Sequence, residues 1–172
     1  HDSQVRQGLL FHGSAGCGRL LLALWLARKL LGQPDRPCAL TPDLEQGVGH
    51  PDFLGITRLE DKRSISIEQI RDLIDFLQLK SLRGGARVAL IWPAEAMTRQ
   101  AGNSLLKTLE EPPDGATIML ITESPGRLPA TIVSRCQRLR INRPTRAESV
   151  GWLNSIDTTA DWEALLDFAL DA

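Results

Sequence analysis

The glycine-rich stretch Gly13-Ser-Ala-Gly-Cys-Gly18 places the strongest limit on how this chain can fold. It follows a short apolar run at residues 8–12 and precedes a leucine-rich segment at residues 19–31 that ends at Gly32. A buried strand, a glycine turn and a helix in this order predict the first unit of a parallel α/β sheet. Apolar positions cover nearly every face of the helix, so we expect it to be buried.

The rest of the chain keeps alternating between apolar runs and segments with helical periodicity. Ser66 with Gln69, and Thr145 with Glu148, have the spacing of capping boxes that begin helices. The alternation predicts a mainly parallel sheet of about five strands between helices. The expected strands are 8–12, 53–57, 88–92, 117–121 and 137–141, and the further expected helices are 66–79, 98–110, 128–135, 145–154 and 161–171.

Composition excludes several classes of protein. The 172 residues carry a net charge of −1, so contact with nucleic acid would need a local basic patch. No apolar run is long enough to cross a membrane, and the N-terminal residues do not form a secretory signal. His1 stands where an initiator Met would, which fits a trimmed sequence. Three widely spaced cysteines fit a reducing environment, so we expect a cytoplasmic protein.

The glycine-rich stretch has the setting of a phosphate-binding loop of the pattern G-x-x-x-x-G-K-[ST]. Gly13, Gly16 and Gly18 would let backbone N–H groups surround phosphate oxygens at a helix N-terminus. However, Arg19 stands where the pattern has Lys, and Leu20 stands where it has Ser or Thr. Leu20 has no oxygen, so one protein ligand to magnesium is lost.

The acidic residue that normally follows a neighbouring strand in such enzymes is also missing. The strand expected at 88–92 is followed by Pro93, and the nearest acid is Glu95. We therefore expect very slow hydrolysis, no bound ATP, and a glycine turn kept for close packing between strand and helix. The alternative is a divergent P-loop ATPase that uses Arg19 in place of Lys.

Three motifs resemble one family. They are Ala101-Gly-Asn-Ser-Leu-Leu-Lys-Thr-Leu-Glu-Glu-Pro-Pro113, Leu128-Pro-Ala-Thr-Ile-Val-Ser-Arg-Cys-Gln137 and His50-Pro-Asp52. The chain resembles the clamp-loader subunits of bacterial DNA polymerase III, which belong to the AAA+ family, over nearly its whole length. An intact Ser134-Arg135-Cys136 beside a degraded P-loop is similar to the delta-prime class of these subunits.

The resemblance implies a fold and a division into domains. Residues 1–143 would form a RecA-like P-loop AAA+ domain with a five-stranded sheet. Residues 144–172 would begin a small helical lid domain that is cut short, and the C-terminal collar domain would be absent.

The resemblance also implies a non-catalytic stator of the DNA polymerase III holoenzyme. Its partners would be the gamma/tau and delta subunits, and it would reach the sliding clamp and primed DNA through the complex. Arg135 would act in trans as an arginine finger on ATP bound by a neighbouring subunit, and Cys136 would be a small buried core residue. The alternative for Arg135 is an ordinary surface ion pair. A second rival function is a P-loop scaffold in another DNA complex, such as a helicase loader.

Other candidate residues follow from the resemblance. Thr122 ends a strand where the family has a polar sensor residue, although it could be a strand-end hydroxyl. Only Cys38 lies where related chains carry a four-cysteine zinc module, so we expect neither zinc nor any other metal. Several basic side chains could face DNA or could be scattered solvated charges: Arg71, Lys80, Arg83, Arg87 and Arg99.

Overall fold

The computed structural model describes residues 8–34, 48–59, 61–82, 84–156 and 161–162. The chain divides into two compact units between Ile141 and Asn142. The first unit holds the sheet, and the second holds helix α6 (Arg146–Ile156). The division lies two residues before the predicted boundary, and the identity of the second unit as a lid domain stays a prediction. Most of the predicted helix at 161–171 lies outside the described residues.

Five strands form one sheet, and every neighbouring pair is parallel. Their spatial order is β2-β3-β4-β1-β5, so β1 lies between β4 and β5. This confirms the predicted parallel α/β sheet. The strands are β1 (Gly8–His12), β2 (Phe53–Ile56), β3 (Arg87–Ile91), β4 (Ala116–Thr122) and β5 (Gln137–Arg140).

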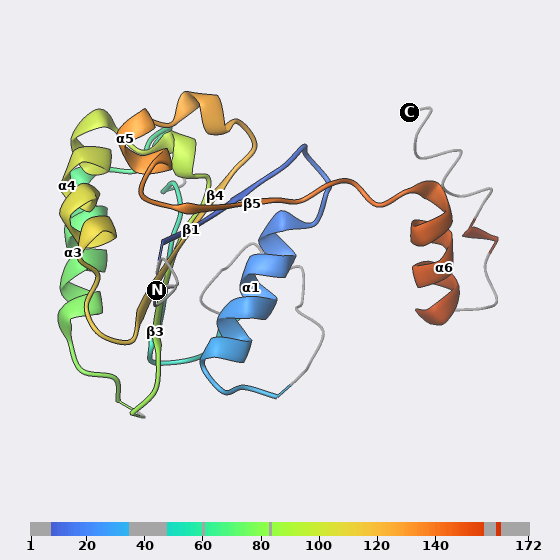
Figure 1. Ribbon diagram of the computed structural model, residues 1–172, viewed down its shortest axis with the longest axis horizontal. Helices are drawn as coiled ribbons and strands as arrows, with labels where there is room; N and C mark the ends of the chain where they lie inside the picture. Colours follow the sequence, from blue (N-terminus) through green and yellow to red (C-terminus); the bar gives the residue numbers. More distant parts are fainter. Residues whose placement is uncertain (1–7, 35–47, 60, 83, 157–160, 163–172) are drawn as a thin grey trace, which may run out of the picture. The chain divides into compact units, whose positions relative to one another are not determined.

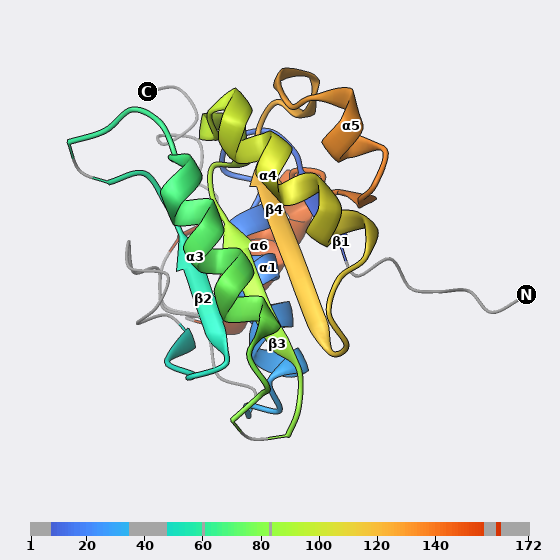
Figure 2. The same ribbon diagram turned by 90° about the vertical axis from the view of Figure 1, so that its left-hand side faces the viewer.

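Helices cover both faces of the sheet. Helix α1 (Arg19–Leu30) lies on one face, and α3 (Ile67–Gln78) and α4 (Arg99–Glu110) lie side by side on the other (Figures 1 and 2). Two 3₁₀ turns, η1 (Ala94–Ala96) and η2 (Pro125–Arg127), follow β3 and β4.

The helix predicted at residues 128–135 is shorter than expected. Helix α5 runs only from Ala130 to Val133. Pro129 precedes it in an extended conformation, which keeps Leu128 and Pro129 out of the helix.

The alternation of side chains along the strands creates two cores. Ala89 and Ile91 of β3 pack with α3 and α4, whereas Val88 and Leu90 pack with α1. All five residues of β3 are buried, including Val88–Ile91 of the predicted apolar run, whereas Trp92 at the end of that run is partly buried.

Helix α1 is less buried than its leucine content indicated. Ala23, Leu24 and Ala27 face the sheet, whereas Leu22 and Trp25 are 39% and 43% exposed. The prediction of a helix buried on all sides was therefore wrong. A helix that packs on one face of a sheet covers only one stripe of its surface, whatever residues occupy the other faces. Its predicted end at Gly32 is confirmed, because that residue has a φ of 68° and its N–H donates to the carbonyl of Lys29.

Both predicted capping boxes are present. The Ser66 side chain accepts from the N–H of Gln69, whose side chain accepts from the N–H of Ser66. The Glu148 carboxylate accepts from the N–H and hydroxyl of Thr145, at 2.7 and 2.8 Å. These hydrogen bonds lower the pKa of Glu148. The beginnings of α3 and α6 are thus fixed by local sequence.

The His50-Pro-Asp52 motif forms a buried polar clamp at the start of β2. The carboxylate of Asp52 is fully buried, and it accepts from the Ser81 hydroxyl at 2.9 Å and from the N–H of Leu82 at 3.0 Å. It also forms an ion pair with Arg87, whose Nη2 lies 3.3 Å from Oδ1. The clamp therefore ties β2 to the connection between α3 and β3.

Arg87 belongs to this clamp rather than to a DNA-facing surface, so that prediction was wrong for this residue. It is 5% exposed, and its guanidinium donates to the carbonyls of Phe76 and Lys80. It also lies over the ring of Phe76, 4.5 Å from the centroid. A buried cation needs such partners, and carbonyls in the last turn of α3 and just after it supply them.

We expect Asp52→Ala to lower the free energy of unfolding by about 3–5 kcal/mol, because it leaves the Arg87 guanidinium buried without its carboxylate. Chemical denaturation would measure the loss. Asp75→Ala, on the exposed side of α3, is the matched control and should stay within about 0.5 kcal/mol of the parent. Equal stabilities for the two variants would contradict the clamp.

Candidate functional site

The glycine-rich loop connects the carboxyl end of β1 to α1, as predicted. Gly16 and Gly18 have φ values of 75° and 79°, in the left-handed region that favours glycine. Gly13 is needed for a different reason. A methyl group there would lie 2.2 Å from the carbonyl oxygen of Ile141 and 2.8 Å from Cys17 Sγ. Close packing therefore accounts for this glycine without any ligand.

The side chain of Arg19 lies within the loop. It is buried, and Nη1 donates to the carbonyl of Ser14 at 2.6 Å and lies 3.8 Å from Cys17 Sγ. Nη2 forms an ion pair with the half-exposed carboxylate of Glu123. The guanidinium thus joins the loop to the residue that follows β4.

Glu123 is not among the site residues predicted from the sequence. It directly follows Thr122, and β4 is the neighbour of β1, so both strand ends reach the same edge of the sheet. The N–H of Glu123 also makes a long contact of 3.5 Å with a carboxylate oxygen of Glu95 from η1. An acidic residue immediately after a predicted strand was the available signal, because the carboxyl ends of parallel strands meet.

Leu20 and Thr122 lie at the same edge and contact groups of their own chain. Leu20 packs partly buried against the core beneath α1, in the position where the phosphate-loop pattern has a hydroxyl. Thr122 is buried, and its Oγ1 accepts from the N–H of Ser124 at 3.0 Å, which is the contact of a strand-end hydroxyl.

His12, the last residue of β1, lies beside a basic strand. Its partner across the β1–β5 pairing is Arg140. Partial burial, together with the charges of Arg138 and Arg140, lowers the pKa of His12. His12 is therefore neutral at pH 7 and adds no positive charge to the loop.

Arg135 lies at the opposite edge of the sheet, just before β5. Its guanidinium donates through Nε to Glu110 Oε1 at 2.7 Å and through Nη1 to the carbonyl of Thr131 at 2.8 Å. Nη2 also contacts Glu110 Oε1. The side chain keeps 31% of its surface exposed, and that of Glu110 keeps 49%. The structure thereby brings together the Ser134-Arg135-Cys136 motif and the end of the signature helix α4.

The other two residues of the motif differ in surroundings. Cys136 is buried, as predicted, and is a free thiol. The hydroxyl of Ser134 lies 3.2 Å from the carbonyl of Thr131.

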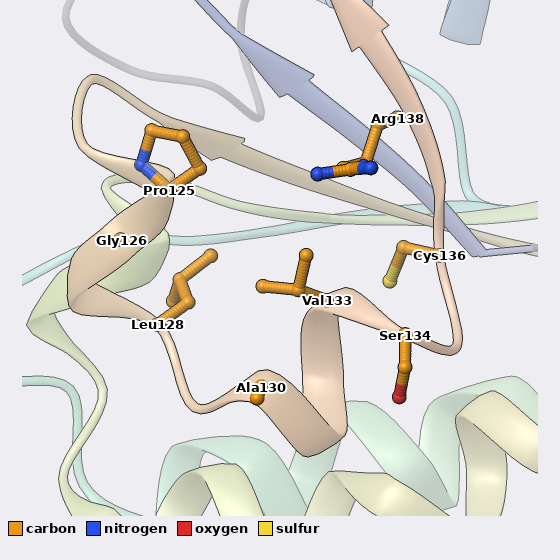
Figure 3. A pocket seen from close by; sticks show the side chains of 8 residues that line it. All are labelled: Pro125, Gly126, Leu128, Ala130, Val133, Ser134, Cys136 and Arg138. Carbon is orange, nitrogen blue, oxygen red and sulfur yellow. The ribbon is translucent and has the colours of Figure 1, made fainter.

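A pocket of about 600 Å³ lies next to the motif, between η2, α5 and β5. Figure 3 shows Leu128 and Val133 pointing into it, with Arg138 reaching across from β5. The surface beside Arg135 is therefore concave and largely apolar. Its lining residues are Pro125, Gly126, Leu128, Ala130, Val133, Ser134, Cys136 and Arg138.

In the part of the chain that the structure describes, no group of three or more His, Cys, Asp or Glu side chains could hold a metal ion. Cys38 lies outside it, so the predicted absence of zinc stays a prediction. None of the described helices is long and apolar enough to span a membrane.

The sequence matches a family model described as DNA polymerase III, delta subunit, over residues 1–145. This match includes the glycine-rich loop, the signature helix and the Ser134-Arg135-Cys136 motif. The chain belongs to this family.

Relatives with curated names agree. The chain is 37% identical over 157 residues to the DNA polymerase III subunit delta' of Pseudomonas aeruginosa, covering 88% of this chain and 48% of the relative. It is 34% identical to the delta' subunit of Escherichia coli, covering 92% and 48%, and 33% identical to the tau subunit of the same organism, covering 80% and 22%. The chain thus spans about half the length of the delta' subunits that it matches.

A solved structure supports the fold. The DNA polymerase III gamma subunit-related protein of Thermotoga maritima superposes with a TM-score of 0.66 at 28% identity, covering 81% of this chain and 42% of that one. The RecA-like, AAA+ fold predicted from the sequence is therefore confirmed for the sheet-bearing unit.

We expect Gly13→Ala to lower the free energy of unfolding by about 3 kcal/mol or more, because the added methyl group would overlap the backbone of Ile141. Gly16→Ala is the control within the same loop. The added methyl group would have open space around it, so only the strain of the left-handed backbone should lower the free energy of unfolding, by about 1 kcal/mol. Thermal unfolding of both variants would decide. A smaller loss for Gly13→Ala would exclude close packing as its role.

Proposed function

We propose that this chain is a non-catalytic subunit of the DNA polymerase III clamp loader. It would help place the sliding clamp on primed DNA, with gamma/tau and delta subunits as its partners. Its own P-loop would be inactive, and Arg135 would serve ATP held by a neighbouring subunit. The family membership supports the assignment to the polymerase III complex.

The observation that carries the proposal is the contrast between two arginines. Arg19 is buried in its own loop and paired with Glu123, whereas Arg135 stays partly exposed at a corner of the sheet. An exposed, hydrogen-bonded guanidinium suits charge stabilisation on a phosphoryl group that arrives with another chain. The guanidinium of Arg19, buried in its own loop, is not placed to contact a phosphoryl group on another chain.

The groups around the glycine-rich loop do not fit a magnesium nucleotide. Arg19 directs its guanidinium to the carbonyl of Ser14 and to Glu123, and its side chain is only 7% exposed, so little of it is open to a phosphate. Leu20 contributes no metal ligand. A divergent ATPase would need nearby carboxylates for magnesium, but that of Glu123 pairs with this arginine instead, and that of Glu95 lies 3.5 Å from the N–H of Glu123.

We expect a fluorescent ATP analogue to show no binding below millimolar concentration, with or without magnesium. Fluorescence anisotropy of the chain against increasing analogue would measure this. Tight binding that requires magnesium would contradict the proposal and favour the divergent ATPase that uses Arg19.

We expect Arg135→Ala to reduce ATP turnover at the neighbouring site by roughly a thousandfold, the effect typical of a lost arginine finger. The measurement uses a loader reconstituted with the full-length subunit, in which the fingers of the other subunits have been replaced. Only the site served by Arg135 then contributes. Arg63→Ala, an exposed arginine outside the motifs, is the control. Unchanged turnover in an assembled Arg135→Ala loader would exclude the finger.

A further inference from the structure

Arg135 is held by a carboxylate from another motif. Glu110 is the last residue of α4, and its Oε1 accepts from both Nε and Nη2 of Arg135. The carbonyl of Thr131 accepts a hydrogen bond from Nη1 of Arg135 at 2.8 Å. All three guanidinium nitrogens are thus engaged by groups of the same chain, which fixes the plane of the side chain.

The contacts leave donors for a ligand. The terminal nitrogens carry more N–H groups than Glu110 and Thr131 use, and Nη1 makes a further, long contact of 3.5 Å with Ser134 Oγ. Glu110 occupies the edge of the guanidinium formed by Nε and Nη2. The end formed by Nη1 and Nη2 therefore still has hydrogens for an anionic oxygen, in a side chain that is 31% exposed.

Helix stability does not explain a carboxylate at this position. The carboxyl end of a helix carries partial negative charge, so Glu110 at the end of α4 is electrostatically unfavourable by a few tenths of a kcal/mol to about 1 kcal/mol. The partly exposed ion pair with Arg135 stabilises the fold by a similarly small free energy. The pair is close to neutral for folding, and its geometric effect on Arg135 remains.

We propose that Glu110 is a positioning residue, which holds the guanidinium of Arg135 in the orientation needed to meet a phosphoryl group in trans. This inference rests on the proposed function of Arg135. Fixing the side chain beforehand avoids the entropy cost of ordering a long arginine when the phosphate is contacted. Glu110 itself touches no reacting atom.

The experiment uses the same reconstituted loader with the full-length subunit, in which Arg135 is the only remaining finger. Glu110→Ala should lower kcat by roughly tenfold, since a displaced catalytic group loses about that much or more. KM for ATP should change less than twofold, because the neighbouring subunit binds the nucleotide. Glu110→Gln keeps one acceptor oxygen and should retain more activity than the alanine variant.

The matched control is Glu111→Ala, which removes the adjacent exposed carboxylate and leaves the pair between Glu110 and Arg135 in place. It should leave kcat unchanged. Assembly of each loader is checked by gel filtration, and thermal unfolding checks that every variant folds.

A double variant tests whether Glu110 affects kcat only through Arg135. Adding Glu110→Ala to an Arg135→Ala loader should cause no further loss if Glu110 acts only through the arginine. Full kcat in Glu110→Ala, with Arg135→Ala still impaired, would overturn this inference and leave the proposed function standing. Higher kcat in Glu110→Ala would also overturn it, because the carboxylate would then hold Arg135 back. Unchanged kcat in both the Glu110→Ala loader and the Arg135→Ala loader would contradict the proposed function itself.

Discussion

The parallel pairing of all five strands determines where each group of interest lies. Parallel strands give the sheet a carboxyl edge and an amino edge, and helices carry the chain back from one to the other. The glycine-rich loop, Glu95 and Glu123 follow strands, so they gather at the carboxyl edge. Arg135 precedes β5 and Glu110 ends the helix before β4, so they meet at the amino edge. A single topological constraint thus separates the glycine-rich loop from the partly exposed Arg135.

The ion pair between Arg19 and Glu123 changes the character of the carboxyl edge. In a P-loop that binds nucleotide, the charge of the lysine is balanced by phosphate. Here a carboxylate from the end of the neighbouring strand balances the guanidinium. Burial of an arginine costs desolvation energy that one half-exposed partner offsets only in part. The main effect of the pair is therefore to fix the position of the loop, because it links the loop after β1 to the end of β4 without a ligand.

Local sequence patterns predicted most of the fold but few of the side-chain contacts. The capping boxes at Ser66 and Thr145 and the apolar run of β3 act within a few residues, so they could be found along the chain. Arg87 was misplaced because nothing near it in the sequence shows that Asp52 lies within 3.3 Å. Likewise, the partners Arg135 and Glu110 are 25 residues apart, and only the packing of α5 beside α4 brings them together.

The pairing of β1 with β5 connects the two edges mechanically. Leu9 lies opposite Gln137 and His12 lies opposite Arg140, so the position of the segment carrying Arg135 is fixed to the strand that leads into the glycine-rich loop. In a nucleotide-driven subunit, that loop would change its contacts with each cycle of binding and release. Arg19 and Glu123 would, under the proposed function, hold the loop, so that β1 keeps the same contacts whatever nucleotide is present. Under the proposed function, internal closure of the P-loop is what makes this chain a stator, because it keeps Arg135 in a constant position for the neighbour that does change.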